Sequence, residues 1–318
     1  MIFFYNRWHH GDLMTQIMLM QKIKREYPDL EIGCCCYYNH AKLLKDMGIN
    51  VIHVSQVMPT RGAISDDRFV DRIIKWNNKN KRQEPCVIFD TWLGQFNDTH
   101  DHNWNNIIEV FNRSVDNLCF SHEELKDVIG HIKLDADSED HYISFPQSYC
   151  NFADKIETDP KTNVYFDCSG PHSGHSSIGH GNFTDKSEEY LWQNIFSKFP
   201  ELNFFTTKDT GVSMKNVNDV SSNNIGELSH ISNKCDYIFG RGSGPYLCTF
   251  TEENKNKKRF LINFFNPVPL ANSERDVYPF PKAGLGGENI RDEHALVTEL
   301  SRICDISTGK EKVLKIGL

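Results

Sequence analysis

Short apolar runs alternate with amphipathic stretches along most of the sequence, and this alternation constrains the fold more than any other feature. The first 55 residues read as strand, helix, strand, helix and strand, from "MIFFY" to "INVIHV". Apolar residues recur at helical spacing between Leu13 and Tyr27, and Pro28 then ends the helix. Strands that are joined by helices in this way predict a parallel sheet with crossover connections.

A second alternation follows an acidic, turn-rich region between residues 130 and 160. Predicted helices separate four strand-like runs, which are "NVYFDCSG", "LNFFTT", "CDYIFG" and "KRFLINFF". One of these helices is expected in "SGPYLCTFTEE". We therefore predict an α/β protein of two Rossmann-like, doubly wound domains, residues 1–155 and 156–318, that face each other across a cleft. In such sheets ligands bind beyond the carboxyl ends of the strands. The last amphipathic stretch is "RDEHALVTELSRICD". Whether this helix packs on its own domain or back on the N-terminal domain is open.

Charge and composition exclude several classes of protein. The net charge of −8 argues against a protein that binds nucleic acid or an anionic membrane, because such proteins usually carry a basic surplus. There are ten cysteines but no C-x-x-C pair, and Cys34, Cys35 and Cys36 are consecutive in an apparent strand. Buried thiols in a reducing compartment fit this pattern better than disulfides or a structural zinc site. The chain opens on a strand and has no run of 18 apolar residues, so we expect a cytoplasmic protein without signal peptide or membrane span.

Asp12 lies between the first strand and the first helix, and two roles are open for it. As an N-cap it would accept a backbone N–H and stabilise the helix by roughly 0.5–2 kcal/mol, the role that spacing alone favours. At the carboxyl end of a strand, the same carboxylate is also where a general base belongs. Gly11 would let a substrate approach closely. His10 is a candidate to orient Asp12, or else an ordinary loop histidine.

A glycine-rich turn follows the predicted strand "CDYIF". Two interpretations are open. The free N–H groups of the turn and the start of the next helix form an anion site, or the segment is an ordinary β–α turn. The fixed charge of the arginine suits a phosphate. The candidate residues are Arg241, Gly242, Ser243 and Gly244. Upstream, Glu227 has the spacing of a capping box with Asn224, and it is also a candidate for ribose hydroxyls.

Two further loops carry candidate binding residues. The loop "DCSGPHSGHSSIGHGNFT" offers Ser169, Gly170 and Ser173 to a diphosphate, unless it is simply a polar loop. Its histidines, at 172, 175 and 180, match no common metal spacing, so we expect no metal site. After another strand, Asp90 and Trp92 are candidates for a sugar acceptor, although Trp92 is slightly better explained as a core residue.

Two blocks of the sequence resemble the heptosyltransferase-like family of GT-B glycosyltransferases, which includes the ADP-heptose:lipopolysaccharide heptosyltransferases. The first block has Gly11-Asp12, a helix that ends in Tyr27-Pro28-Asp29, and the strand "LEIGCCC". The second has Glu227-Leu228, Cys235-Asp236 and then Ser243-Gly244-Pro245 at a helix start. The order and separation of the blocks agree with the family, so the resemblance covers most of the chain.

The resemblance implies an inverting, metal-independent transfer of a sugar from a nucleotide-diphosphate donor to a hydroxyl of a glycan or glycolipid. Asp12 would be the base, and the C-terminal domain would hold the donor, with Lys186 as a loose match to a family lysine. No cofactor is required, no nucleic acid is bound, and membrane contact is at most peripheral. Gly242 and Leu247 stand where the family usually has Asp and His, which leaves the donor open. Two alternatives remain: a nucleotide-sugar epimerase or hydrolase, and a degenerate module that only binds nucleotide or carbohydrate.

Overall fold

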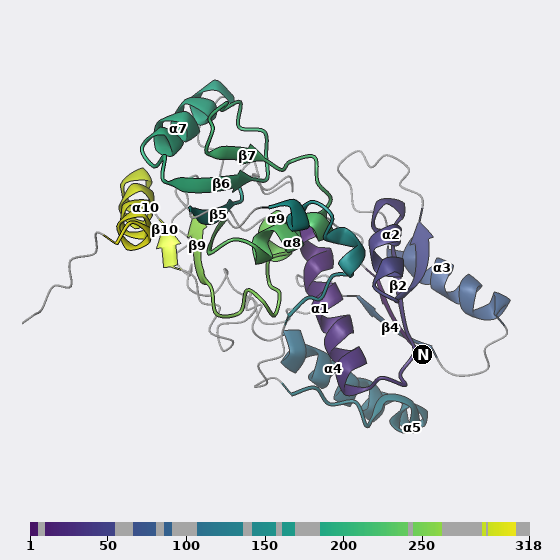
Figure 1. The fold of residues 1–318 in the computed structure, drawn as a ribbon. Helices are drawn as coiled ribbons and strands as arrows, with labels where there is room; N and C mark the ends of the chain where they lie inside the picture. The colour runs from purple at the N-terminus through teal and green to yellow at the C-terminus, as the bar shows by residue number, and fades with distance from the viewer. Residues whose placement is uncertain are drawn as a thin grey trace, which may run out of the picture. The chain divides into compact units, whose positions relative to one another are not determined.

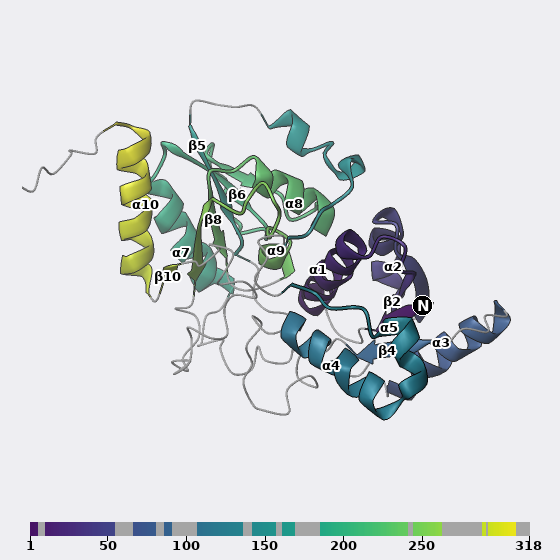
Figure 2. The same cartoon turned by 90° about the horizontal axis from the view of Figure 1, so that it is seen from below.

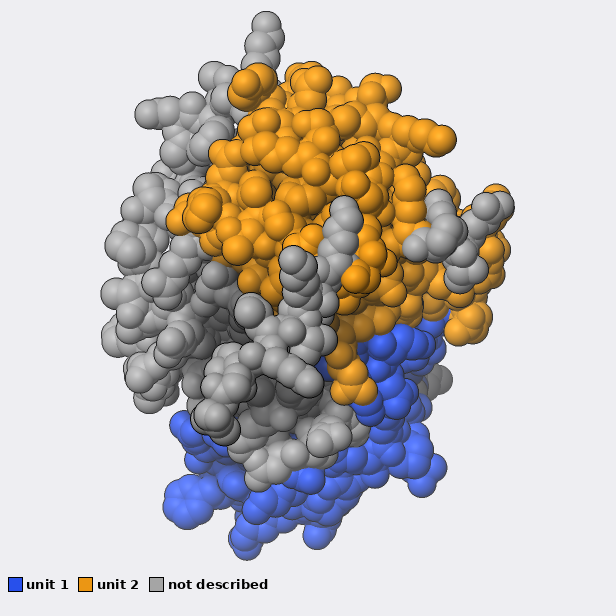
Figure 3. Space-filling model, turned by 60° about the vertical axis from the view of Figure 1, so that its left-hand side comes forward, with its two compact units in different colours: residues 1–146, 250–255, 272–286 blue, residues 147–249, 256–271, 287–318 orange. Residues whose placement is uncertain are grey.

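The computed structural model describes most of the chain, and all statements on structure refer to that part. The described residues are 1–5, 10–54, 66–80, 86–90, 107–135, 142–156, 161–168, 185–240, 244–262, 288–290 and 292–309. They form two compact units (Figure 3). Unit 1 takes its described residues from 1–146 and 250–255, and unit 2 from 147–249, 256–262 and 288–309.

Unit 1 is a four-stranded parallel sheet with helices on both faces, in the strand order β3-β2-β1-β4 (Figure 1). Along the chain its elements are β1 (Ile2–Tyr5), α1 (His10–Glu26), β2 (Ile32–Tyr37), α2 (Tyr38–Asp46), β3 (Asn50–Val54), α3 (Asp66–Lys79), β4 (Val87–Asp90), α4 (Ile107–Ser121), the short 3-10 helix η2 (Glu123–Leu125) and α5 (Lys126–Ile129). Nearly all of these elements match the predicted order of strands and helices.

The two inner strands of unit 1, β1 and β2, are buried on both faces, as expected for a parallel sheet with helices on each side. On one face, Phe69 and Ile73 of α3 pack with Phe3 of β1. On the other face, Phe111 of α4 lies against Phe4, at 6.2 Å between ring centroids. The three consecutive cysteines of β2 are fully buried, which confirms the predicted buried thiols.

Unit 2 is a six-stranded parallel sheet in the order β10-β9-β8-β5-β6-β7. Its elements are η3 (Gln147–Tyr149), η4 (Ala153–Lys155), β5 (Thr162–Phe166), α7 (Asp185–Ser197), β6 (Leu202–Thr206), β7 (Val217–Asp219), α8 (Ile225–Asn233), β8 (Tyr237–Gly240), α9 (Gly244–Leu247), β9 (Lys258–Ile262), β10 (Glu288–Ile290) and α10 (Glu293–Ser307). Helices α7 and α10 lie along one face of this sheet, and α8 lies on the other (Figure 2).

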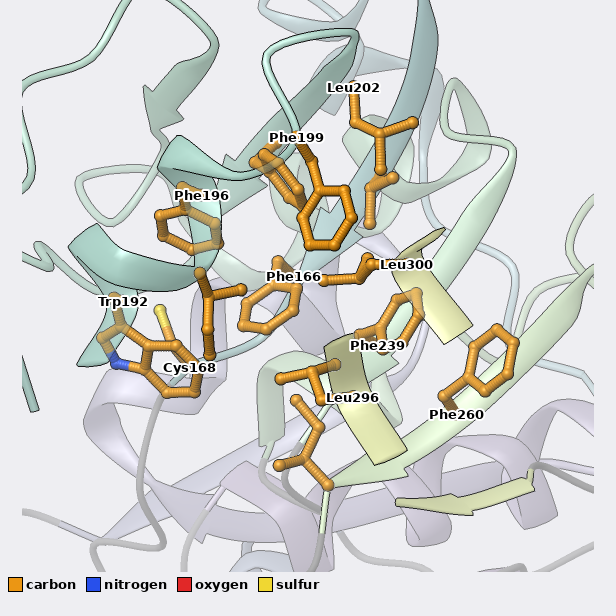
Figure 4. Close-up of a cluster of buried hydrophobic side chains, with 14 of the residues drawn as sticks. Phe166, Cys168, Trp192, Phe196, Phe199, Leu202, Phe239, Phe260, Leu296 and Leu300 are labelled. Carbon is orange, nitrogen blue, oxygen red and sulfur yellow. The ribbon is translucent and has the colours of Figure 1, made fainter. Parts of the chain in front are cut away.

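An aromatic core fills the space between the sheet of unit 2 and helices α7 and α10 (Figure 4). Phe166 of β5 lies at its centre, edge-to-face with Trp192 and stacked on Phe239 at 5.7 Å. Leu296 and Leu300 of α10 belong to the same core. The last amphipathic stretch thus packs on the sheet of its own unit, where its apolar stripe completes this core.

Several predicted boundaries differ from those observed. The chain first passes between the units at Pro146–Gln147 and not at residue 155. The reason is local: Tyr149 packs against Gly226 of α8, so the segment that follows Pro146 belongs to unit 2. The helix that was expected in "SGPYLCTFTEE" is only the single turn α9, and the three-residue strands β7 and β10 were not predicted.

An extended segment of unit 1, residues 131–135 and 142–145, packs against the helices of that unit. Side chains of the helices, and not a neighbouring strand, form hydrogen bonds with its backbone. Asn112 of α4 bonds both backbone groups of Leu134, at 2.8 and 2.9 Å. Gln21 of α1 does the same for Ser144, at 2.7 and 2.8 Å.

Within the described ranges, none of the helices combines the length and apolar character needed to cross a membrane.

Candidate functional site

The first candidate region is the carboxyl edge of the sheet in unit 1. Strand β1 ends at Tyr5, and α1 begins at His10. Asp12 therefore lies inside the first turn of α1 and not before it, so the N-cap role that spacing favoured is wrong. A carboxylate in the first turn is favoured in its ionised form by the positive end of the helix dipole. The side chains of His10 and Asp12 lie outside the described part of the structure.

Asp90 reaches the same sheet edge from a different strand. It is the last residue of β4, and its backbone is paired in register with Tyr5 at the end of β1. The topology thus brings Asp90 beside Tyr5, the last residue of the strand that precedes Asp12, although the sequence separates them widely. The Asp90 side chain and all of Trp92 lie outside the described residues, so their predicted contact with an acceptor stays a prediction.

The second candidate region is the carboxyl edge of the sheet in unit 2. Strands β5 and β8 are neighbours and parallel, with Phe166 in register with Phe239. The segments that leave these two strands therefore start side by side at one edge. One segment contains the predicted Ser169, Gly170 and Ser173, and the other contains Arg241, Gly242 and Ser243. These six residues are not among those that the structure describes.

The residues that flank these segments are described, and they fix where the segments begin and end. The β8 segment starts after Gly240 and ends at Gly244, the first residue of α9. The β5 segment starts after Cys168 and ends at α7. Lys186 is in the first turn of α7, although its side chain is not described. All the predicted donor residues except Glu227 thus belong to, or adjoin, the connections that leave β5 and β8.

A buried acid lies at this edge that the sequence analysis did not single out. Asp167, the residue after β5, is fully buried, and its Oδ1 accepts a hydrogen bond from the Thr207 hydroxyl at 2.6 Å. Its backbone N–H donates to Phe239 O, which ties the ends of β5 and β8 together. The signal for Asp167 was available, since it is a lone acid directly after an apolar strand. Its hydrogen bonds to Thr207 and Phe239 O give it a structural role at this edge.

A partly buried ion pair adjoins the same edge. Lys208, which follows β6, lies 3.2 Å from Glu188 of α7, and their side chains are 42% and 15% exposed. The Glu188 side chain also accepts a hydrogen bond from Trp192 Nε1 at 3.4 Å. These contacts tie the first turns of α7 to the end of β6.

Glu227 acts in the helix cap that was one of its two predicted roles. The Asn224 side chain accepts hydrogen bonds from the backbone N–H groups of Gly226 and Glu227, at 3.0 and 3.1 Å. In return, Glu227 Oε2 accepts the Asn224 N–H at 3.0 Å. This capping box accounts for the position of the glutamate. Its predicted contact with a ribose stays a prediction.

The fully buried cysteines of this unit, Cys168, Cys235 and Cys248, have raised thiol pKa values. Burial raises the pKa of the Cys168 thiol from 9.0 to about 12, with the nearby Asp167 carboxylate adding to the effect. Burial likewise raises the pKa of Cys248 well above its usual value. A thiol of this kind is a poor nucleophile, because the thiolate is the reactive form. All ten cysteines of the chain are free.

In the part of the chain that the structure describes, no group of histidine, cysteine and acidic side chains is arranged to hold a metal ion. The histidines at positions 172, 175 and 180 lie outside that part, so the prediction that they bind no metal is untested.

No protein-family model matches the sequence, and no curated protein sequence matches it either. Solved structures do share its fold. A glycosyl transferase of family 9 from Veillonella parvula aligns with a TM-score of 0.56 and 9% identity, covering 96% of this chain and 97% of that chain. The E. coli heptosyltransferase WaaC with ADP-2-deoxy-2-fluoro heptose aligns with a TM-score of 0.50 and 10% identity, covering 96% of this chain and 99% of that one.

These matches define the class of fold. The chain has the α/β architecture of the GT-B glycosyltransferases, with two parallel sheets. In particular, the predicted resemblance to heptosyltransferase-like glycosyltransferases is confirmed at the level of the fold.

Proposed function

We propose that the protein is a glycosyltransferase that moves a sugar from a nucleotide-diphosphate donor to an acceptor hydroxyl, with inversion and without a metal. The fold carries this proposal: it matches a family 9 glycosyl transferase over nearly the whole of both chains. The similar E. coli heptosyltransferase WaaC, in its structure with ADP-2-deoxy-2-fluoro heptose, supports a nucleotide sugar as donor. The sequence adds Asp12 in unit 1 and the Ser243-Gly244-Pro245 turn in unit 2.

In the proposed reaction, Asp12 is the general base. Its carboxylate takes the proton of the acceptor hydroxyl while the hydroxyl oxygen attacks the anomeric carbon of the donor sugar. The bond between that carbon and the diphosphate oxygen breaks on the opposite face, and the nucleoside diphosphate leaves with the electron pair. Two observations support this role for Asp12: it lies in the first turn of α1, and it follows the central strand of the sheet. A base of this kind contributes roughly 10²–10⁴-fold to the rate.

In the proposed donor site, the two segments that leave β5 and β8 bind the diphosphate. The adjacency of these strands supports a shared role, because both segments start at the same edge of the sheet. Arg241 would neutralise the departing charge, and the N–H groups and hydroxyls of the two segments would bind its oxygens. Lys186, in the first turn of α7, is the further cation that we assign to this site. Asp90, with Trp92, is assigned to the acceptor.

A thermal-shift panel of ADP-, GDP-, UDP- and CMP-sugars tests the proposed function. The donor should raise the melting temperature, since a ligand at a hundred times its Kd stabilises the folded state by about 2.7 kcal/mol. The CMP-sugar controls for the diphosphate, because it carries one phosphate only. Consumption of the bound donor is then measured with and without added glycan acceptors. If none of the nucleotide sugars raises the melting temperature, the proposal is wrong. Consumption that no acceptor increases would favour the epimerase or hydrolase alternative, and binding without consumption would favour the binding module.

A further inference from the structure

The segment that follows the glycine-rich turn of unit 2 is too short to hold its own conformation. Helix α9 is a single turn, Gly244–Leu247, and isolated helices of this length are not stable in water. A site that stabilises a developing charge needs donors that are fixed in advance. Contacts from the rest of unit 2 must therefore hold α9 in place.

One such contact comes from β5. The Tyr165 hydroxyl donates a hydrogen bond to the carbonyl oxygen of Pro245, the second residue of α9, at 2.9 Å. The Cys248 thiol donates to the same oxygen at 3.1 Å. Tyr165 is fully buried, so water does not compete for its hydroxyl. Tyr165 lies on β5, so this one side chain ties β5 to α9.

A second contact comes from β9. The Arg259 side chain is almost fully buried, and its Nη1 donates to Thr249 O at 3.0 Å, while Nη2 donates to the Thr249 hydroxyl. That hydroxyl in turn donates to Tyr246 O at 2.7 Å. The guanidinium carbon also lies 5.1 Å from the centre of the Tyr246 ring, within the range of a cation–π contact. Arg259 thus fixes both the backbone after α9 and the aromatic ring within it.

The Tyr246 ring closes this set of contacts against the end of β8. A Cβ atom added to Gly240 would lie 2.0 Å from Cδ2 of Tyr246, so the ring occupies the space that a side chain at 240 would need. Gly240 is the residue immediately before Arg241. The ring therefore packs α9 directly against the last residue of β8.

We propose that Tyr165 and Arg259 are positioning residues, which hold α9, and with it the proposed diphosphate-binding residue Gly244, against the end of β8. This inference rests on the proposed function and adds two residues that do not themselves contact the donor. A buried arginine costs more desolvation than an apolar side chain of the same size. Its bonds to Thr249 and its contact with Tyr246 are the interactions that an apolar side chain would not supply.

Two conservative variants test the inference, with a third as matched control. Tyr165→Phe removes only the hydroxyl, and Arg259→Lys keeps the charge but loses the two-pronged geometry of the guanidinium. The control is Lys257→Met. Lys257 donates to Asn233 O and Ser232 O, at 2.7 and 3.3 Å, so it also anchors helix carbonyls, but those at the end of α8. The Kd of ADP, GDP and UDP is measured for each folded variant by calorimetry. The 31P chemical shifts of the bound nucleotide are measured at saturation.

The variants should weaken binding of the nucleoside diphosphate by about fivefold or more, the equivalent of one hydrogen bond, and should move the bound 31P resonances. Lys257→Met should leave both within experimental error of the wild type. An unchanged Kd in Tyr165→Phe and Arg259→Lys, or an equal loss in Lys257→Met, overturns the inference. If Arg259→Lys does not fold, Tyr165→Phe alone decides. A wild-type protein that binds none of the three nucleotides overturns the proposed function, and this inference with it.

Discussion

At the scale of single residues, Gly240 has the least room for a side chain among the described glycines. The ring of Tyr246 fills the space where a Cβ would lie, and both residues are buried. Gly240→Ala should lower the free energy of unfolding by about 1–3 kcal/mol, because the ring must move within a packed core. Urea unfolding measures this. Gly48→Asn is the control: Gly48 has a φ of 74° and nothing within 4 Å of an added Cβ, so the change should be small. A Gly240→Ala variant as stable as the control would contradict the packing described here.

Buried thiols give a second prediction at this scale, on pH. Burial raises the pKa of Cys35 and Cys168 from 9.0 to about 12 in the folded state. The unfolded chain therefore loses these protons first, so the free energy of unfolding should be constant from this source below about pH 9 and fall between about pH 9 and 12. Urea unfolding at about pH 8 and about pH 10.5 measures the fall. It should be smaller in Cys168→Ala. A free energy that rises with pH in this range, or a fall that Cys168→Ala leaves unchanged, would count against the assignment.

Single residues were predicted from the sequence with uneven success. The fully buried Cys34, Cys35 and Cys36 followed from their place in an apolar run. Tyr165 and Arg259 were not predicted as part of a site, because strand patterns indicate which segment is buried but not what a polar side chain bonds to. Their partners, Pro245 and Thr249, are distant in sequence, and only the packing of β5, β9 and α9 brings them together.

At the scale of elements, α8 has the best-defined start among the helices of unit 2. Asn224→Ala should lower the free energy of unfolding by about 1 kcal/mol through loss of the cap. Glu227→Gln should leave stability nearly unchanged, since glutamine serves equally in a capping box. Nucleotide affinity should not change in either variant if capping is the role of Glu227. A loss of nucleotide affinity in Glu227→Gln at unchanged stability would instead assign the glutamate to the ribose.

The end of α1 gives a second prediction at this scale, on the docked segment of unit 1. The Tyr27 hydroxyl accepts the Lys133 N–H at 2.9 Å and lies 3.1 Å from Lys133 O and 3.2 Å from His131 O. Tyr27→Phe should cost about 1–2 kcal/mol and speed hydrogen exchange of the Lys133 amide, because two backbone groups lose their partner. Tyr190→Phe, at a residue 73% exposed, is the control and should change neither. Slow exchange at Lys133 in Tyr27→Phe would contradict this role.

Elements were predicted where a periodic pattern was long enough to read. The strands of four residues or more and the long helices followed from such patterns. Strands β7 and β10 are three residues each, too short for any periodicity. The predicted helix that begins at Gly244 was too long. The observed helix ends at Leu247, where the Thr249 hydroxyl donates to Tyr246 O and Arg259 donates to Thr249 O. A distant side chain, which local sequence does not reveal, meets the backbone where the helix would have continued.

At the scale of the whole molecule, the fold was predictable because two repeats of strand and helix can form few other architectures. The resemblance of two motif blocks to glycosyltransferases agrees with a fold match that covers nearly the entire chain. The later points at which the chain passes from one unit to the other were not predictable. Residues 250–255 belong to unit 1 although their neighbours on both sides belong to unit 2, and the Ile143 N–H donates to Phe250 O at 2.7 Å. A contact between segments so distant in sequence leaves no local pattern.

The central claim is that one carboxylate in unit 1 activates the acceptor while unit 2 binds the nucleotide. The most direct test measures sugar transfer and nucleoside-diphosphate affinity in the same Asp12→Asn preparation. Asparagine keeps the size of the side chain but cannot accept the proton, so transfer should fall by at least about hundredfold. The Kd of the nucleoside diphosphate should stay equal to that of the wild type. Transfer at an undiminished rate in Asp12→Asn would contradict the account.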